Sequence, residues 1–273
     1  MSKHLVIGGS GTLLPYYIGA IRSLEHNNIT FKSITGTSGG AFIGSLLALG
    51  LSSYDIEKLL LSVVFKDFAD YSLNPFYRVG LLNGDKILKF LKEKIPYKIG
   101  QTKIPLTIVT TNLSKEYTND RVTYWNTYTT PNKELPQLIR ASISIPMLFK
   151  YTLIDNNIHV DGGVSNNFAT NIIPKDERKD IIGLKMDTTF AKQRKLDSNI
   201  LFNLIDYLLT IIDTMMLSVE REHISTDIYN QIIKIPSSVS GVDFNLTETQ
   251  IKIMIQEAYD FTEKYIKQNN LYI

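Results

Sequence analysis

Ser38 stands at the centre of the segment Gly36-Thr37-Ser38-Gly39-Gly40, which has the form Gly-x-Ser-x-Gly. Between a strand and a helix, such a turn holds the serine in a strained conformation with its hydroxyl exposed, and the flanking glycines let the backbone pass closely. The N-terminus of the following helix favours an oxyanion nearby. The segment predicts a nucleophilic serine. The alternative is a glycine- and serine-rich turn without chemistry.

A second glycine-rich turn, Gly8-Gly9-Ser10-Gly11, follows the first expected strand. It is typical of a dinucleotide site, of an oxyanion hole or of a tight turn with no chemistry. The dinucleotide pattern Gly-x-Gly-x-x-Gly is incomplete, because Leu14 stands at the position of the third glycine. With a candidate nucleophile one crossover later, we expect the backbone amides of Gly9, Ser10 and Gly11 to stabilise an oxyanion.

An aspartate is available as the general base. Asp161-Gly162-Gly163 follows the expected strand 158–160, and the two glycines allow another backbone to approach. The alternative is an ordinary Asp-Gly turn. His223 is the only histidine after this aspartate, and it falls in the last turn of an expected helix, where a solvated position is favoured. A serine–aspartate dyad needs no histidine, whereas a triad would depend on His223.

These residues require a scaffold of alternating strands and helices. We expect strands at 4–8, 31–35, 106–111, 121–126, 152–154, 158–160, 181–186 and 231–235. We expect helices at 15–27, 41–49, from 52, at 85–94, 135–141, 199–222 and 247–267. This order predicts an α/β fold with a mostly parallel central sheet. We expect a single domain over 1–273, with a core of about 4–190 and a C-terminal helical completion of about 196–273.

The composition excludes several classes of protein. The chain has 273 residues, 44% of them hydrophobic and 21% charged, with a formal net charge of +2. These values argue against global disorder and against nucleic-acid binding through bulk charge. The absence of cysteine excludes disulfide scaffolds and thiolate metal sites. The four histidines lack the spacing of a helical zinc site, so a zinc enzyme is not expected. A serine–aspartate dyad uses no metal, and we expect no cofactor.

No segment predicts a signal peptide or a transmembrane helix. The longest apolar stretch, 200–219, contains Asp206 and Asp213, and two carboxylates are rare in a membrane span. We therefore expect a cytoplasmic or peripheral membrane protein.

Four motifs, in this order along the chain, resemble the patatin-like phospholipases. The opening segment 5–24 is similar to the family's first strand, oxyanion loop and first helix, and 36–40 is similar to its nucleophile elbow. Arg140-Ala-Ser-Ile-Ser-Ile-Pro146 and then Phe149 resemble the segment before the catalytic aspartate. The stretch 161–167, Asp-Gly-Gly-Val-Ser-Asn-Asn, matches the family's Asp-Gly-Gly motif and its trailing asparagine.

The resemblance implies a three-layer α/β/α sandwich and a lipid acyl hydrolase without a metal. It implies that Ser38 is the nucleophile, that Asp161 is its base, and that Gly9, Ser10 and Gly11 form the oxyanion hole. Gly36, Gly39, Gly40, Gly162 and Gly163 would be the supporting glycines. The expected partner is a phospholipid or another acyl-ester lipid at a peripheral membrane contact.

One departure from the family motivates a second hypothesis. The family's loop usually carries a basic residue and then glycine, where this chain has Leu13 and Leu14. If position 14 needed a positive φ, leucine would be strained there and glycine would not. The alternative function is therefore a catalytically weakened member that binds a lipid or a partner. A dinucleotide-dependent oxidoreductase is a third hypothesis, although no acidic residue stands where a ribose partner is expected.

Two apolar regions are candidates for the route by which a lipid reaches the site. The first is an aromatic segment that suits an interfacial lid or ordinary core packing: Phe65, Phe68, Tyr71, Leu73, Phe76 and Tyr77. The second is 200–219, which suits the wall of an acyl pocket or a plain core helix.

Overall fold

The computed structural model describes residues 2–63, 65–72, 79–116, 120–187, 207–208, 210–212, 214–216, 218–220, 226–237 and 245–269. The strands are β1 (Ser2–Ile7), β2 (Thr30–Thr37), β3 (Gly80–Leu82), β4 (Leu106–Asn112), β5 (Val122–Asn126), β6 (Met147–Phe149), β7 (Thr152–Ile154), β8 (Asn157–Asp161), β9 (Ile181–Asp187) and β10 (Ile232–Pro236).

The α-helices are α1 (Leu14–His26), α2 (Gly39–Ala48), α3 (Ser53–Leu61), α5 (Asp85–Lys94), α6 (Leu135–Ser142), α7 (Gly163–Asn166) and α9 (Glu248–Asn269). Short 3-10 helices are η1 (Phe65–Phe68), η2 (Ile99–Gln101), η3 (Thr170–Ile172), η4 (Lys175–Asp180) and η5 (Thr226–Gln231). The described residues between 207 and 220 are helical, and the rest of the expected helix 199–222 lies outside the described residues.

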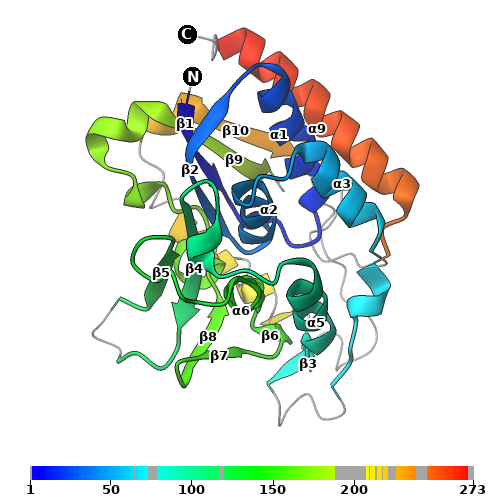
Figure 1. Ribbon diagram of the computed structural model, residues 1–273, viewed down its shortest axis with the longest axis vertical. Helices are drawn as coiled ribbons and strands as arrows, with labels where there is room; N and C mark the ends of the chain where they lie inside the picture. The colour runs from blue at the N-terminus through cyan, green and yellow to red at the C-terminus, as the bar shows by residue number, and fades with distance from the viewer. Residues whose placement is uncertain are drawn as a thin grey trace.

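The central sheet has the strand order β10-β9-β1-β2-β4-β8-β7, and β5 also pairs with β4 (Figure 1). The pairs from β10 to β4 are parallel, whereas β4–β5, β4–β8 and β8–β7 are antiparallel. The parallel strands are joined by helical crossovers, as parallel connections require. The sheet is thus parallel over the half that carries Ser38 and antiparallel over the half that carries Asp161.

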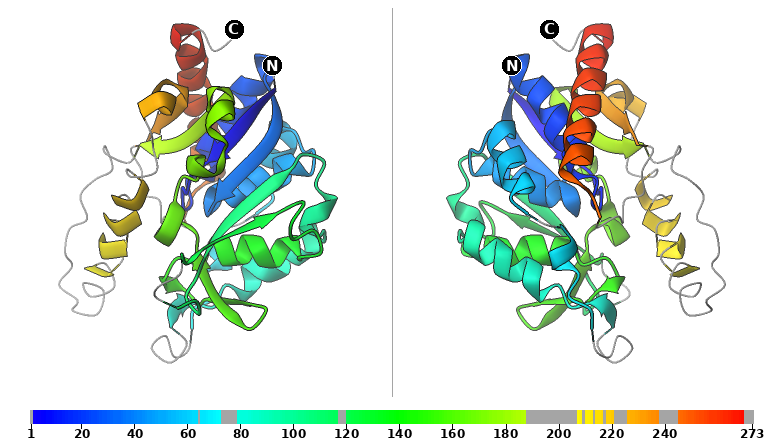
Figure 2. Two further views of the ribbon diagram at one scale, coloured as in Figure 1. Left: turned by 90° about the vertical axis from the view of Figure 1, so that its left-hand side faces the viewer. Right: turned by 90° about the vertical axis from the view of Figure 1, so that its right-hand side faces the viewer.

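Helices lie on both faces of the sheet, as Figure 2 shows, so the predicted α/β/α sandwich is confirmed. Strand β1 illustrates why. Leu5 and Ile7 belong to the large core beneath α1, α2 and α9, whereas Val6 belongs to a smaller core with Phe168 and Ile173 on the opposite face. All three strand residues are fully buried, and neighbouring side chains of a strand point to opposite faces. Such a strand needs cover on both sides.

A small second sheet was missed by the sequence analysis. Strands β3 and β6 have only three residues each and pair in parallel, with Gly80 beside Met147 and Leu82 beside Phe149. Three-residue runs have too little periodicity to be recognised in a sequence. Of the expected lid segment, Phe68 is half-buried and Tyr71 is exposed, whereas Leu73, Phe76 and Tyr77 lie outside the described residues.

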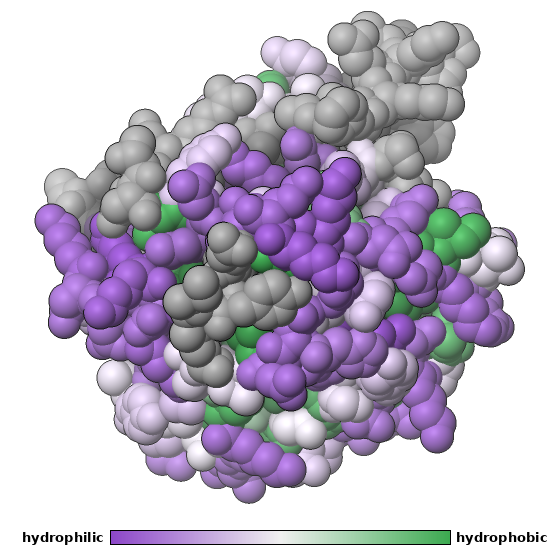
Figure 3. Space-filling model, turned by 90° about the horizontal axis from the view of Figure 1, so that it is seen from above, coloured by the Kyte–Doolittle hydropathy of each residue, from purple (hydrophilic) through white to green (hydrophobic). Residues whose placement is uncertain are grey.

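The surface seen in Figure 3 is mainly hydrophilic. On that face, the hydrophobic side chains of the described residues form small separate spots rather than one broad area. Scattered exposed apolar groups are normal for a protein surface and do not by themselves mark an interface.

Candidate active site

Ser38 occupies the turn between β2 and α2, in a backbone conformation that is costly for any residue with a side chain. Its φ is 53° and its ψ is −125°. The neighbouring glycines make this turn possible. A Cβ on Gly40 would lie 2.3 Å from the carbonyl oxygen of Ile7, and one on Gly36 would lie 2.5 Å from the carbonyl oxygen of Gly40. This is the geometry that the Gly-x-Ser-x-Gly spacing predicts for a nucleophile elbow.

The sheet topology brings Ser38 and Asp161 together, although 123 positions separate them. Strand β4 lies between β2 and β8. Thr37 pairs with Val109, and Thr110 pairs with Asp161, so the end of β2 and the end of β8 reach the same level of the sheet. The Ser38 Oγ donates a 2.6 Å hydrogen bond to Asp161 Oδ2.

The environment of Asp161 favours a neutral carboxyl group. The side chain is fully buried, and burial raises its pKa from 3.8 to about 7. Hydrogen bonds from the Ser38 hydroxyl and from the Gly163 amide, which lies 2.8 Å from Oδ1, oppose this shift. A carboxylate with a pKa near neutrality is a better proton acceptor than an ordinary aspartate.

Ser142 holds the elbow from the opposite side, a role that the sequence analysis did not assign. Its Oγ accepts a 2.9 Å hydrogen bond from the Ser38 amide and donates a 2.7 Å bond to the carbonyl oxygen of Val109. The amide of Asp161 donates to the carbonyl oxygen of Ser144 at 2.9 Å. The motif from Arg140 to Pro146 was the available signal, because both serines belong to it.

The second glycine-rich turn lies beside the elbow. A Cβ on Gly9 would lie 3.4 Å from the Cβ of Ser38 and 2.3 Å from Asn167 Oδ1. The Gly9 amide donates to the carbonyl oxygen of Asn167 at 3.3 Å, so it is engaged within the protein. Within the described part of the chain, the amides of Ser10 and Gly11 have no acceptor. These two are the amides of this turn that remain for an oxyanion.

The turn after β8 is equally tight. A Cβ on Gly162 would lie 2.3 Å from the carbonyl oxygen of Val109, and one on Gly163 would lie 3.1 Å from Asp161 Oδ1. Gly162 therefore packs against β4, and Gly163 packs against the Asp161 carboxylate.

The expectation that Leu14 strains the loop is wrong. Among the described residues, Leu13 and Leu14 are not in the positive-φ region, and the left-handed position of this turn is Gly11, with a φ of 56°. Leu14 is the first residue of α1, where ordinary helical dihedrals apply. The backbone strain that would weaken the site is therefore absent, whereas Leu13 still stands where the family has a basic residue. The side chain of Leu14 lies instead against Gly39, on the wall of a cavity.

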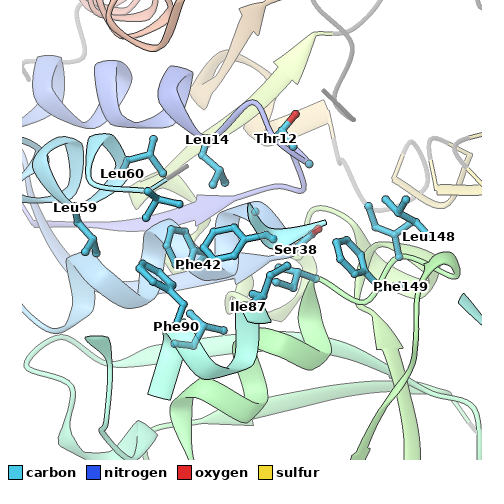
Figure 4. Close-up of a pocket in the computed structure, with 17 residues that line it drawn as sticks. Thr12, Leu14, Ser38, Phe42, Leu59, Leu60, Ile87, Phe90, Leu148 and Phe149 are labelled. Atoms are coloured by element: carbon cyan, nitrogen blue, oxygen red, sulfur yellow. The ribbon is translucent and has the colours of Figure 1, made fainter. Parts of the chain in front are cut away.

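That cavity adjoins Ser38 and is lined almost entirely by apolar side chains (Figure 4). Its walls come from the β1–α1 turn with the start of α1, from α2, α3, η1 and α5, and from the α6–β6 connection with β6. The lining residues are Gly11, Thr12, Leu14, Ser38, Gly39, Phe42, Leu59, Leu60, Val63, Phe68, Ile87, Phe90, Leu91, Ile143, Ile145, Leu148 and Phe149. The described residues of 200–219, which were expected as one possible wall, are not among them.

The other predictions concern histidine, metals and the membrane. His223 lies outside the described residues, so the triad interpretation finds no contact to test it. No group of histidine and acidic side chains suited to a metal ion occurs in the described ranges. Nor does any described helix have the length and apolar character to cross a membrane.

Similar proteins are known from viruses and bacteria. The uncharacterized protein R571 of Acanthamoeba polyphaga mimivirus is 28% identical over 278 residues, which cover 93% of this chain and 90% of that protein. The probable lipid hydrolase 463L of Invertebrate iridescent virus 6 is 28% identical, over 65% of each chain. The crystal structure of VipD from Legionella pneumophila has the same fold, with a TM-score of 0.59 and 18% identity, covering 98% of this chain and 67% of VipD.

The family model of patatin-like phospholipases matches residues 5–173. This range contains the glycine-rich turn, the elbow with Ser38, the supporting Ser142 and the aspartate that accepts the hydrogen bond of the elbow serine. The match covers more than half of the chain and agrees with the fold and with the four motifs. The chain belongs to the patatin-like phospholipase family.

Proposed function

We propose that this protein hydrolyses the fatty-acyl ester bond of a lipid, as a phospholipase A or lysophospholipase, through a Ser38–Asp161 dyad. The observation that carries this proposal is a 2.6 Å hydrogen bond to the buried Asp161 from the strained Ser38, which lies at the wall of an apolar cavity. The family supports a lipid ester hydrolase, and the name of the viral relative 463L agrees with it.

In the acylation step, Ser38 Oγ attacks the ester carbonyl carbon while Asp161 Oδ2 accepts the hydroxyl proton. The amides of Ser10 and Gly11, with the N-terminus of α2, face the negative charge that develops on the carbonyl oxygen. The ester C–O bond then breaks, and the leaving alkoxide takes the proton from Asp161. The products are an alcohol and an acyl-enzyme.

In the deacylation step, Asp161 accepts a proton from water as the water oxygen attacks the acyl carbonyl. The acyl bond to Ser38 Oγ breaks, the serine recovers its proton from Asp161, and a fatty acid is released. Both steps use the same base, and neither step requires a metal or a cofactor. The pKa of about 7 lets Asp161 accept and return a proton near neutral pH.

We also propose that the chain functions as one domain and meets its lipid at a peripheral membrane contact. The support for one domain is that β10 extends the central sheet and that α9 packs along α1, so the C-terminal elements complete the N-terminal ones (Figure 1). Nucleic acid is not proposed as a partner, because the net charge is only +2.

The test is reaction with a small fluorophosphonate, followed by peptide mass spectrometry and by assays on lysophospholipid and phospholipid vesicles. We expect one adduct on Ser38, none in Ser38→Ala, and slow labelling in Asp161→Asn. Hydrolysis by the Ser38→Ala protein, or an adduct on another serine, would refute the dyad. Labelling of Ser38 without lipid hydrolysis would refute the lipid substrate and retain the activated serine.

A further inference from the structure

The cavity beside Ser38 differs in character between its two ends. Near the nucleophile, Leu14 projects from the start of α1 toward the elbow, and Figure 4 shows it above Ser38 and Phe42. Its Cδ2 lies 2.8 Å from where a Cβ on Gly39 would stand, so it packs directly over the residue after the nucleophile. A group on the carbon next to an ester carbonyl would meet this side chain first.

The far end of the cavity is aromatic. Phe42 follows Ser38 by four positions at the start of α2, so the two lie one helical turn apart. In Figure 4, Phe90 lies on the far side of Phe42 from Ser38. The rings of Phe90 and Phe68 are in contact, with centroids 5.3 Å apart and planes inclined at 60°. This contact holds the Phe90 side chain of α5 against Phe68 of η1.

The size of the cavity limits the size of its occupant. Its volume is about 110 Å³, and an apolar cavity of ~150 Å³ is known to accept benzene. The smaller cavity therefore suits a slender hydrocarbon segment, and Leu14 is the side chain that narrows it beside Ser38. Among the described residues, Ser38 and Thr12 are the polar side chains that line it, so a charged head group would lose its hydration there with little compensation.

We infer that Leu14 and Phe90 determine which acyl groups this enzyme accepts: Leu14 excludes branching beside the scissile carbonyl, and Phe90 limits the length of a single straight chain. This inference rests on the proposed acyl hydrolase function and names its substrate class. Leucine at position 14, where the family motif has glycine, is then a selectivity residue of this chain rather than a defect of the oxyanion loop.

The experiment compares p-nitrophenyl esters of straight acids of four to twelve carbons with their 2-methyl derivatives. For the wild-type protein, kcat/KM should rise up to about fourfold for each methylene buried and then stop rising when the cavity is filled.

Leu14→Ala removes three carbons from the wall. We expect it to raise the 2-methyl to straight-chain ratio of kcat/KM at least tenfold. Leu24→Ala is the matched control, because Leu24 is fully buried in the same helix and does not line the cavity.

In Phe90→Ala, the acyl-chain length at which kcat/KM stops increasing should be longer by several methylenes. Phe261→Ala is its control, since Phe261 packs against the core on α9 and is not a lining residue. If Leu14→Ala does not fold, Leu14→Val, which removes one carbon, should shift the same ratio in the same direction. Equal selectivity in the Leu14 variants and in Leu24→Ala would overturn the inference, as would a wild-type preference for branched esters.

Binding separates a failure of this inference from a failure of the proposed function. Calorimetry on Ser38→Ala protein with straight and branched alcohols, from hexanol to dodecanol, reports on the cavity without catalysis. Preferential binding of straight alcohols, relaxed by Leu14→Ala, supports the selectivity even if no ester is hydrolysed. Ester hydrolysis with unselective binding and unselective turnover contradicts the inference and leaves the hydrolase function intact.

Discussion

His159 and Asp161 lie two residues apart on β8, and both are buried, but their surroundings differ. His159 Nδ1 is hydrogen bonded to Thr110 Oγ1 at 3.0 Å, and its ring contacts Trp125 at a centroid distance of 5.4 Å. Asp161 accepts its bonds from the elbow hydroxyl and from the Gly163 amide. Burial lowers the pKa of His159 to about 4 and raises the pKa of Asp161 to about 7.

The difference shows that a shifted pKa does not by itself mark a catalytic group. Desolvation disfavours the charged form of either side chain, so it moves the two pKa values in opposite directions. Only Asp161 contacts a strained serine at the wall of a cavity. His159 is therefore assigned to the core, although a histidine is the usual base beside a catalytic serine.

The largest expected effect is on hydrolysis. Ser38→Ala and Asp161→Asn should each lower kcat by at least about 10³-fold, because nucleophile and base act as one unit. His159→Gln should change kcat less than tenfold, since its ring bonds to Thr110 and not to the dyad. The measurement is steady-state ester hydrolysis, with thermal unfolding to verify that each variant folds. A 10³-fold loss in a folded His159→Gln protein would reverse the assignment.

The next effect is on stability. The pKa of Asp161 is about 7 in the folded protein and near 3.8 when unfolded, so the folded state binds the additional proton between these values. This contribution is fully present below about pH 4 and is lost as the pH rises through 7. It should lower the free energy of unfolding by about 4 kcal/mol between pH 4 and pH 8. Because other groups also titrate in this range, the fall is measured as the difference in the free energy of unfolding between wild type and Asp161→Asn, from urea unfolding at each pH.

His159 should contribute a pH dependence of opposite sign. Its pKa is about 4 in the folded protein and near 6.5 when unfolded, so the unfolded state binds the additional proton as the pH falls. Acidification from pH 7 to pH 4 should therefore destabilise the protein by about 3 kcal/mol through this group. The difference in the free energy of unfolding between wild type and His159→Gln should change by this amount over the same range. A difference that stays constant with pH would show that the ring is hydrated in the folded state.

The smallest effect is the pH dependence of turnover. Because only the ionised carboxyl group accepts a proton, kcat/KM should rise about tenfold between pH 6 and pH 8 and level off above the pKa of Asp161. His159→Gln should leave the midpoint unchanged, whereas a midpoint near pH 4 would mean that the site is hydrated before substrate binds. The measurement is hydrolysis of an uncharged ester at constant ionic strength.

Particular residues show how far the sequence could predict the site. The strand–turn–helix around Ser38 was predictable, because glycines at 36 and 40 have few other uses at that spacing. The role of Ser142 was not, since its hydrogen bonds reach Ser38 and Val109, which are distant in the chain. The concern about Leu14 assumed a positive φ at that position, but Gly11 provides it.

The sequence by itself determined the local chemistry: which serine can occupy a strained turn, which loop can present its amides, and that strands and helices alternate. Those properties depend on neighbouring residues and on periodicity. Only the tertiary structure decided that β4 brings Ser38 and Asp161 to the same level, and that burial raises the pKa of the aspartate. It also placed residues of six chain segments around one apolar cavity. Long-range strand pairing and desolvation depend on groups that are far apart in the chain. A local sequence pattern therefore cannot predict them.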